Sequence, residues 1–225
     1  MIEKDIASRL ERTKLYTEQQ VVEEVLEVAD RSWELLEKIT KIIVPGMLES
    51  DAVFAIKKLF EESKVDRIWH PVHARFGKNT ILQFHQQAST DVRLQEEDIA
   101  FVDIGIVFNA VEGDVGHTLV FGDNPNYHKI QKVTEEIFEE AVAYWKKSFP
   151  TGIQLYQFIQ QITEQKGFQF NLDPAGHLIG SYPHVGWKRG LSTYPKYPEP
   201  ANWILEIQIS DPKLNVGGFF EKILF

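Results

Sequence analysis

The acidic side chain whose position is hardest to explain is Asp103, which interrupts the most apolar run of the sequence, Ile99-Ala-Phe-Val-Asp-Ile-Gly-Ile-Val-Phe108. The run is rich in β-branched and aromatic residues, which is typical of a strand. Because side chains on a strand alternate between its two faces, Asp103 would point the same way as Phe101 and Val107. A lone buried carboxylate is very costly unless it is protonated, paired or bound to a cation. A structural salt bridge would explain one such residue, so a chemical role depends on further carboxylates nearby.

Three further carboxylates follow the same pattern. Asp114 lies 11 residues after Asp103, across a predicted hairpin, and an odd separation places two residues on the same face of an antiparallel pair. Glu206 and Glu221 lie 15 residues apart on the last two predicted strands, again an odd number. Carboxylates that face each other repel unless a positive charge lies between them. The pattern therefore predicts four carboxylates at one centre, two from each half of the chain.

Four carboxylates at one centre suit two divalent cations about 3.5–4 Å apart. The segment Ala175-Gly-His-Leu-Ile-Gly180 adds an imidazole, His177, on a short extended piece between two glycines. An imidazole ligand favours Mn, Fe, Co or Zn over Ca. His184 follows seven residues later, and His85 precedes it by 99 residues at the end of an extended segment. We interpret these two histidines as counterparts in the two halves of the chain.

Hydrophobic periodicity predicts the same order of elements twice. The first half has helical patterns at 17–43 and 49–63, extended segments at 66–73 and 79–85, and a hairpin formed by 99–108 and 115–121. The second half has helical patterns at 128–147 and 153–166, extended pieces at 177–185, and strands at 203–209 and 218–225. We therefore expect an α+β fold in which a helix-helix-antiparallel-strand unit is duplicated around one core. The alternative is coincidence, because helices followed by strands are common.

One domain is expected over residues 17–225, preceded by a short helical extension over residues 1–16. The composition excludes several other classes of protein. The 225 residues contain no cysteine, which excludes disulfides, zinc ribbons, iron–sulfur clusters and thiol catalysis. A net charge of −9 argues against nucleic acid as a partner, and no apolar run reaches the roughly 18 residues of a membrane span. Because the N-terminus carries acids where a signal or transit peptide carries bases, we expect a cytoplasmic protein.

The order of the candidate residues resembles the pita-bread metallopeptidase superfamily, which holds methionine aminopeptidase, Xaa-Pro aminopeptidase, prolidase and the metal-free creatinases. The resemblance runs from about residue 17 to the C-terminus. It rests on five ordered positions: Asp103 in Val-Asp-Ile-Gly, Asp114 in Gly-Asp-Val-Gly-His-Thr, His177 in Gly-His-Leu-Ile-Gly, Glu206 and Glu221. The His-Val-Gly of 184–186 is closer to the Xaa-Pro aminopeptidase and prolidase branch, although the separate N-terminal domain of the larger members has no counterpart in this sequence.

The resemblance implies a pita-bread fold and a metal-dependent hydrolase that cleaves an N-terminal or dipeptide amide bond of a peptide or small amide substrate. It also implies two divalent ions (Mn, Co, Fe or Zn), with these ligands: Asp103, Asp114, His177, Glu206 and Glu221. Asp114 and Glu221 would bridge the two ions, and Glu206 would also shuttle a proton. His85 and His184 would contact the substrate. A homodimer is a further expectation.

Two other functions stay open: a non-catalytic member that binds a peptide or protein partner, and a creatinase-like amidinohydrolase. Both kinds of protein usually lose metal ligands, and all five are intact here. Phe219 and Asp173 stand where proline-specific relatives usually have Arg and His, which leaves the substrate preference open.

Three further histidines have weaker interpretations. His70 and His73, in Trp69-His-Pro-Val-His73, are interpreted as structural residues at the end of a strand. His117 and Thr118 are interpreted as hydrogen-bond partners of the ligands.

Overall fold

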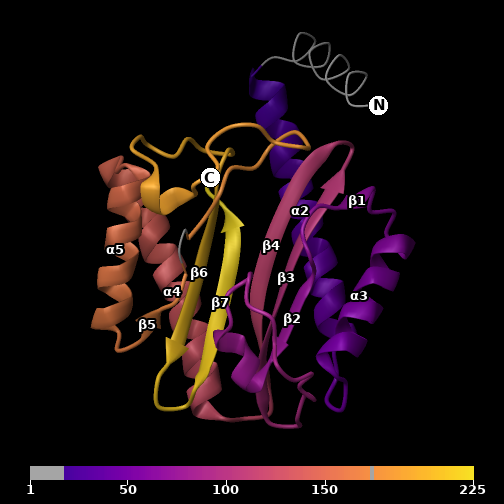
Figure 1. Cartoon of the computed structure of the whole chain (residues 1–225). Helices are drawn as coiled ribbons and strands as arrows, with labels where there is room; N and C mark the ends of the chain where they lie inside the picture. The colour runs from indigo at the N-terminus through magenta and orange to yellow at the C-terminus, as the bar shows by residue number, and fades with distance from the viewer. Residues whose placement is uncertain (1–17, 173–174) are drawn as a thin grey trace.

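The computed structural model describes residues 18–172 and 175–225 (Figure 1). The helical extension expected over residues 1–16, and Asp173, lie outside this part of the chain. The described residues of the first half form the following elements: α2 (Glu18–Ile42), α3 (Glu49–Glu62), β1 (Arg67–Ile68), β2 (His73–Phe76), η1 (Gly77–Ile81), β3 (Asp98–Phe108) and β4 (Val111–Phe121). Those of the second half form α4 (Pro125–Ser148), α5 (Gly152–Gln165), β5 (Gln169–Phe170), η2 (Leu191–Thr193), β6 (Ile204–Asp211) and β7 (Val216–Ile223).

The strands form one antiparallel sheet whose order is β1-β3-β4-β7-β6-β5, with β2 also paired to β3. Each half therefore contributes a long hairpin to the middle of the sheet and a two-residue strand to its edge. The two halves lie side by side and meet where β4 pairs with β7 (Figure 1). The expectation of an α+β fold with a duplicated helix-helix-antiparallel-strand unit is confirmed.

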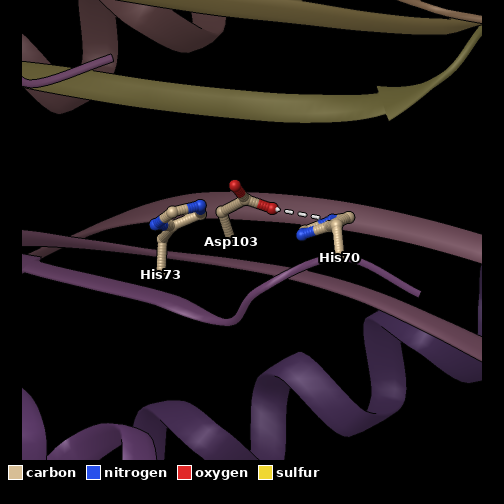
Figure 2. A group of neighbouring side chains, drawn as sticks. All are labelled: His70, His73 and Asp103. Carbon is tan, nitrogen blue, oxygen red and sulfur yellow. Dashed lines mark ion pairs between the residues drawn. The ribbon is translucent and has the colours of Figure 1, made fainter. Parts of the chain in front are cut away.

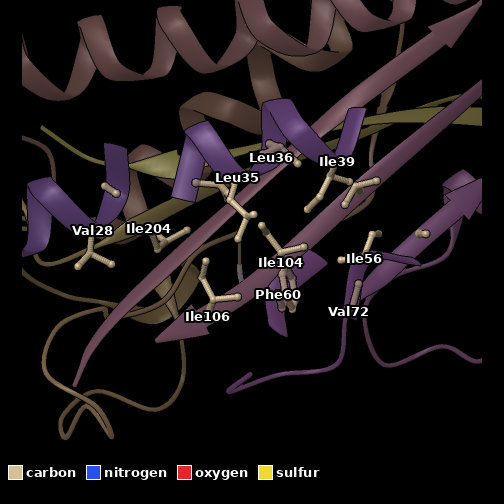
Figure 3. Close-up of a cluster of buried hydrophobic side chains, with 14 of the residues drawn as sticks. Val28, Leu35, Leu36, Ile39, Ile56, Phe60, Val72, Ile104, Ile106 and Ile204 are labelled. Atoms are coloured by element: carbon tan, nitrogen blue, oxygen red, sulfur yellow. The ribbon is translucent and has the colours of Figure 1, made fainter. Parts of the chain in front are cut away.

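The helices pack on one face of the sheet because alternate strand residues are apolar. Ile104 and Ile106 of β3 pack with Leu36 and Ile39 of α2 and with Phe60 of α3 (Figure 3), and all of these side chains are buried. Full burial of one such side chain stabilises the fold by about 1.5–3 kcal/mol. The β3 residues that alternate with Ile104 and Ile106, including Asp103, point to the opposite face of the sheet.

A second apolar cluster occupies the same side of the sheet in the other half. It joins Ile137 and Trp145 of α4 and Ile159 of α5 to Leu205 and Ile207 of β6. No helix among the described residues is both long and apolar enough to cross a membrane.

The structure differs from two of the expected extended segments. Residues 79–85 do not form a strand, because the Thr80 hydroxyl donates a 2.6 Å hydrogen bond to the Gly77 carbonyl and closes a turn of 3-10 helix. Thr80 also accepts the Gly217 N–H at 2.8 Å, which ties this turn to β7. Residues 66–73 are split into β1 and β2 around Pro71, which lacks the N–H that a strand would use.

Candidate metal centre

The register of the sheet places the candidate carboxylates in one row across its two hairpins. Glu206 of β6 pairs directly with Glu221 of β7, and Glu221 pairs with Gly116 of β4. Gly116 in turn pairs with Asp103 of β3, so four strands contribute to the row. Asp114 lies two residues from Gly116 on the same strand and therefore on the same face. The four expected carboxylates thus come together on the face of the sheet that the helices leave free.

These carboxylates are buried and incompletely satisfied. The exposed fractions are 8% for Asp103 and 2% for both Asp114 and Glu221. Asp103 Oδ1, Asp114 Oδ2 and Glu221 Oε2 have no hydrogen-bond partner among the described residues. Buried carboxylate oxygens without donors are costly unless a cation compensates them. The oxygens present therefore fit divalent metal ions.

His177 presents its Nε2 atom to this row. Its Nδ1 lies 2.8 Å from the Leu178 carbonyl, which accepts the Nδ1 hydrogen, so Nε2 is the ring nitrogen that faces the carboxylates. Nε2 lies 3.0 Å from Asp114 Oδ2 and 3.8 Å from Glu206 Oε1 and Glu221 Oε1. The contact to Asp114 has the distance of a hydrogen bond but not its alignment. Potential ligand atoms of Asp114, His177 and Glu221 all lie within 4.8 Å of one another, which suits one ion.

His70, which the sequence places at a strand end as a structural residue, also lies at the centre beside Asp103 and Asp114 (Figure 2). Its ring repeats the arrangement of His177: Nδ1 lies 2.8 Å from the Pro71 carbonyl, and Nε2 lies 3.0 Å from Asp114 Oδ1 and 3.5 Å from Asp103 Oδ1. His73 starts β2 directly opposite Asp103, and its ring stacks on His70 at 6.3 Å between centroids. A second group of potential ligand atoms is thus formed by His70, His73 and Asp103.

Two features of the sequence could have revealed His70. It precedes His177 by 107 residues, which is also the separation of Asp114 and Glu221. Gly105, opposite Asp114 in the hairpin, makes room for the ring, since a Cβ atom there would lie 2.0 Å from His70 Cδ2. The glycine of Val-Asp-Ile-Gly thus admits a side chain from a different segment.

The remaining candidates are placed differently. His184 and His85 both line the cavity above the carboxylates, and His184 Nδ1 lies 2.7 Å from Glu112 Oε2. The expectation that His117 and Thr118 contact the ligands is wrong. His117 points to the helical face, where Nε2 lies 2.9 Å from Glu135, and the Thr118 hydroxyl bonds both the N–H and the carbonyl of Phe219.

The cavity has a volume of about 640 Å³ and reaches the centre from outside. The carboxylates and His70 lie on its floor, and three aromatic residues line its walls: Trp69, Phe84 and Trp187. This size and apolar lining suit a small organic ligand such as a short peptide. Lys188 is the one Lys or Arg among the described residues that line it.

Burial shifts the titration of the carboxylates. It raises the pKa of Asp103 to about 7 and also raises the pKa of Glu206 and, strongly, of Glu221. Burial acts in the same direction on Asp114, but the two histidine rings beside it hold its pKa below the ordinary value. Without bound cations, three of the four carboxylates therefore retain protons to a higher pH than usual.

The histidines respond to the same charges. Burial alone would lower the pKa of His70, but Asp114 and Asp103 raise it to about 11. The pKa of His177 is likewise raised well above its ordinary value by Asp114 and Glu221, against the effect of burial. Burial and the nearby Arg75 lower the pKa of His73 to about 4. Two imidazolium rings therefore balance the carboxylates when no metal is bound.

These shifts predict how metal binding and stability depend on pH. Asp103, His70 and His177 bind protons more tightly in the folded than in the unfolded chain, so the stability they contribute is lost as pH rises through their folded pKa values. His73 acts in the opposite direction, but only between about pH 4 and 6.5. Metal binding displaces the same protons and is favoured as pH rises. We therefore expect Mn²⁺ to raise the melting temperature more at pH 8 than at pH 6.5, as measured by differential scanning calorimetry.

Equal increases at the two pH values would show that these groups do not titrate with metal binding. Asp98→Asn is the matched control, because Asp98 is a buried carboxylate of β3 that accepts the Gln95 and Ile99 N–H groups, away from the centre. This variant should keep the full pH dependence of the metal effect.

Comparison with known proteins agrees with this geometry. Residues 23–206 match Metallopeptidase family M24, a range that includes all the candidate ligands except Glu221. The chain is 25% identical to the Xaa-Pro dipeptidase of Pyrococcus furiosus over 219 residues, which cover 95% of this chain and 60% of that protein. It is 33% identical to the human mitochondrial methionine aminopeptidase 1D over 92 residues, which cover 40% of this chain and 27% of that protein. The chain thus spans 60% or less of the length of these relatives.

Solved structures share the fold. The X-Pro aminopeptidase of Thermotoga maritima superimposes with a TM-score of 0.77 at 18% identity, over 95% of this chain and 60% of that one. The methionine aminopeptidase of the same organism gives a TM-score of 0.71 at 19% identity, over 92% of both chains. These likenesses confirm the expected pita-bread fold. The match over residues 23–206 shows that the chain belongs to metallopeptidase family M24.

Proposed function

We propose that this protein is a metal-dependent peptidase that cleaves an N-terminal or dipeptide amide bond of a short peptide. The observation that carries the proposal is the set of buried carboxylate oxygens without hydrogen-bond partners beside the Nε2 atom of His177. We propose two divalent ions, drawn from Mn, Co, Fe and Zn, with five ligands: Asp103, Asp114, His177, Glu206 and Glu221. His70 is added as a sixth donor, because its Nε2 faces Asp114 as that of His177 does. When bound, such ions supply Lewis acidity and a water of lowered pKa.

The residues of the chain then bind the peptide and move the proton. Glu206 lies at the edge of the row, its side chain 14% exposed, and burial raises its pKa, which suits a group that takes a proton from water and passes it to the departing amine. His184 presents Nε2 of its ring to the cavity and is proposed to hold the scissile amide by accepting a hydrogen bond from its N–H group. His85 lines the same cavity, with its ring against Phe84, and is proposed to orient the peptide.

Hydrolysis of a peptide panel tests this function. The panel includes Xaa-Pro, Xaa-Ala and Met-Xaa dipeptides and tripeptides, assayed with Mn, Co, Zn and Fe in turn. We expect chelated protein to be inactive and Mn or Co to restore hydrolysis. Full activity of protein shown to be metal-free would refute the metal-dependent mechanism. Tight peptide binding without hydrolysis under every metal would favour a binding protein instead.

Preference for proline after the scissile bond is expected to be weak or absent. Proline-specific relatives usually have an arginine at the position of Phe219, which here packs on Phe101 at 5.0 Å between ring centroids and joins an apolar cluster with Leu172. Gly116 leaves space for this ring, since a Cβ atom there would lie 2.2 Å from Phe219 Cε1. Comparison of kcat/KM for Xaa-Pro and Xaa-Ala dipeptides measures the preference, and strong selection of Xaa-Pro would contradict the expectation.

A further inference from the structure

Glu112 is a buried carboxylate next to the centre that is not part of the proposed ligand set. It lies on β4 two residues before Asp114, so its side chain points to the same face of the sheet, and its exposed fraction is 1%. Both of its oxygens are used by one residue. Oε1 accepts the backbone N–H of His184 at 3.0 Å, and Oε2 lies 2.7 Å from the ring Nδ1 of His184. Glu112 therefore binds both the main chain and the ring of a residue 72 positions away.

The backbone fixes the segment that carries His184 at the same place. β7 pairs with β4 at Gly116 and His117, and the earlier residues of β4 are contacted instead by residues 180–182. The Glu112 N–H donates to the Gly180 carbonyl and the Tyr182 N–H donates to the Ala110 carbonyl, both at 2.8 Å. Main-chain hydrogen bonds thus attach residues 180–182 to the start of β4, and the Glu112 carboxylate attaches His184, two residues later.

The orientation of the His184 ring follows from this contact. A carboxylate oxygen 2.7 Å from Nδ1 requires the hydrogen at Nδ1, so the ring presents Nε2 to the cavity. Trp69 contacts the ring edge-on at 6.0 Å and His177 stacks on it at 6.2 Å between centroids, which restricts its rotation. The same relation, a buried carboxylate that fixes the tautomer of a reactive histidine, occurs in hydrolytic triads.

We propose that Glu112 is a positioning residue that fixes the tautomer and direction of the His184 ring for peptide hydrolysis. The catalytic part of this inference rests on the proposed function, whereas the control of the tautomer does not. The role is separate from metal binding, because both oxygens of Glu112 are engaged by His184.

A Glu112→Gln substitution changes the tautomer of the His184 ring while it keeps the shape of the side chain at position 112. The His184 backbone N–H can only donate, so the amide oxygen of the glutamine must face it. The amide NH₂ group then faces Nδ1, which must accept, and the ring hydrogen of the neutral imidazole moves to Nε2. The variant keeps the volume of the side chain and both contacts but reverses the tautomer of the His184 ring. We therefore expect kcat to fall by about 10- to 100-fold with a smaller change in KM.

The tautomer is measured by ¹⁵N NMR of histidine-labelled, zinc-loaded protein, with the His184 signals identified by their absence in His184→Ala. We expect the hydrogen at Nδ1 in the wild type and at Nε2 in Glu112→Gln, with unchanged metal content. In the His184→Ala background, Glu112→Gln should not lower kcat further, because Glu112 acts through the ring. An unchanged tautomer in Glu112→Gln, or losses in kcat that multiply in the double variant, would overturn the proposal.

Glu49→Gln is the matched control. Glu49 is also a buried carboxylate that accepts a backbone N–H, from Phe76 at 2.7 Å, and a side-chain amide, from Asn79 at 2.9 Å, but its contacts are with β2 and η1. Its substitution should lower the melting temperature without changing the His184 tautomer. If the wild type hydrolyses no peptide, the proposed function fails, and the NMR result alone decides whether Glu112 sets the tautomer.

Discussion

An Asp114→Asn variant is expected to lose most of its bound metal and, with it, peptide hydrolysis. Each oxygen of Asp114 faces a different imidazole: Oδ1 lies 3.0 Å from His70 Nε2 and Oδ2 lies 3.0 Å from His177 Nε2. An asparagine carries no charge and would direct an NH₂ group at one of these rings. Loss of a hydrogen-bond partner of a ligand typically costs about 10- to 100-fold in metal affinity, so loss of a shared ligand should cost more than about 100-fold. Elemental analysis after dialysis and the peptide assay measure both effects.

The comparison variant for this prediction is His177→Ala, which should retain more metal than Asp114→Asn because an imidazole serves one ion only. Glu221→Gln should resemble Asp114→Asn. If Asp114→Asn bound two ions with the affinity of the wild type, the shared position of Asp114 between the ions would be wrong.

Removal of the His184 ring is expected to slow turnover by about 100-fold, because the ring holds the scissile amide in position for attack. Because this contact aligns the amide and adds little to the affinity for the peptide, KM should change by a smaller factor. His184 is outside the ligand set, so metal content should stay that of the wild type. Kinetics, melting temperature and metal content of His184→Ala provide the test, with His85→Ala alongside.

Near-normal turnover of His184→Ala with its metal bound would remove His184 from the mechanism. A fall in melting temperature with an unchanged rate per folded molecule would instead mark a structural residue. His85 is expected to follow the same direction, since it lines the same cavity.

The shared face of the carboxylates could be predicted, because the alternation of side chains between the two faces of a strand depends only on local sequence. The odd sequence separations alone placed Asp103 and Asp114 on one face, and likewise Glu206 and Glu221. The structure has Glu206 directly opposite Glu221. Asp103 and Asp114 are instead offset by two residues, because the two-residue turn at Asn109 and Ala110 pairs Asp103 with Gly116. The pairing of carboxylates within each hairpin therefore follows from the sequence, except for this offset.

His70 could not be predicted in the same way. It reaches the centre because residues 67–69 pair with residues 105–107 of β3, a contact between segments about 38 positions apart that no local pattern encodes. Thr118 shows the opposite case. Its face was predicted, but its hydroxyl is used by the Phe219 main chain, 101 residues later, and not by a ligand.

The central claim is that the buried carboxylates and imidazoles of the centre hold two metal ions. The most direct test is the number of ions per chain in purified protein reconstituted with Mn²⁺ at pH 8 and dialysed, determined by elemental analysis against protein concentration. Two equivalents in the wild type and in Asp98→Asn, and fewer than one in Asp114→Asn, are the result expected from this geometry. Wild-type protein that retains no ion, or retains the same number as Asp114→Asn, would contradict it.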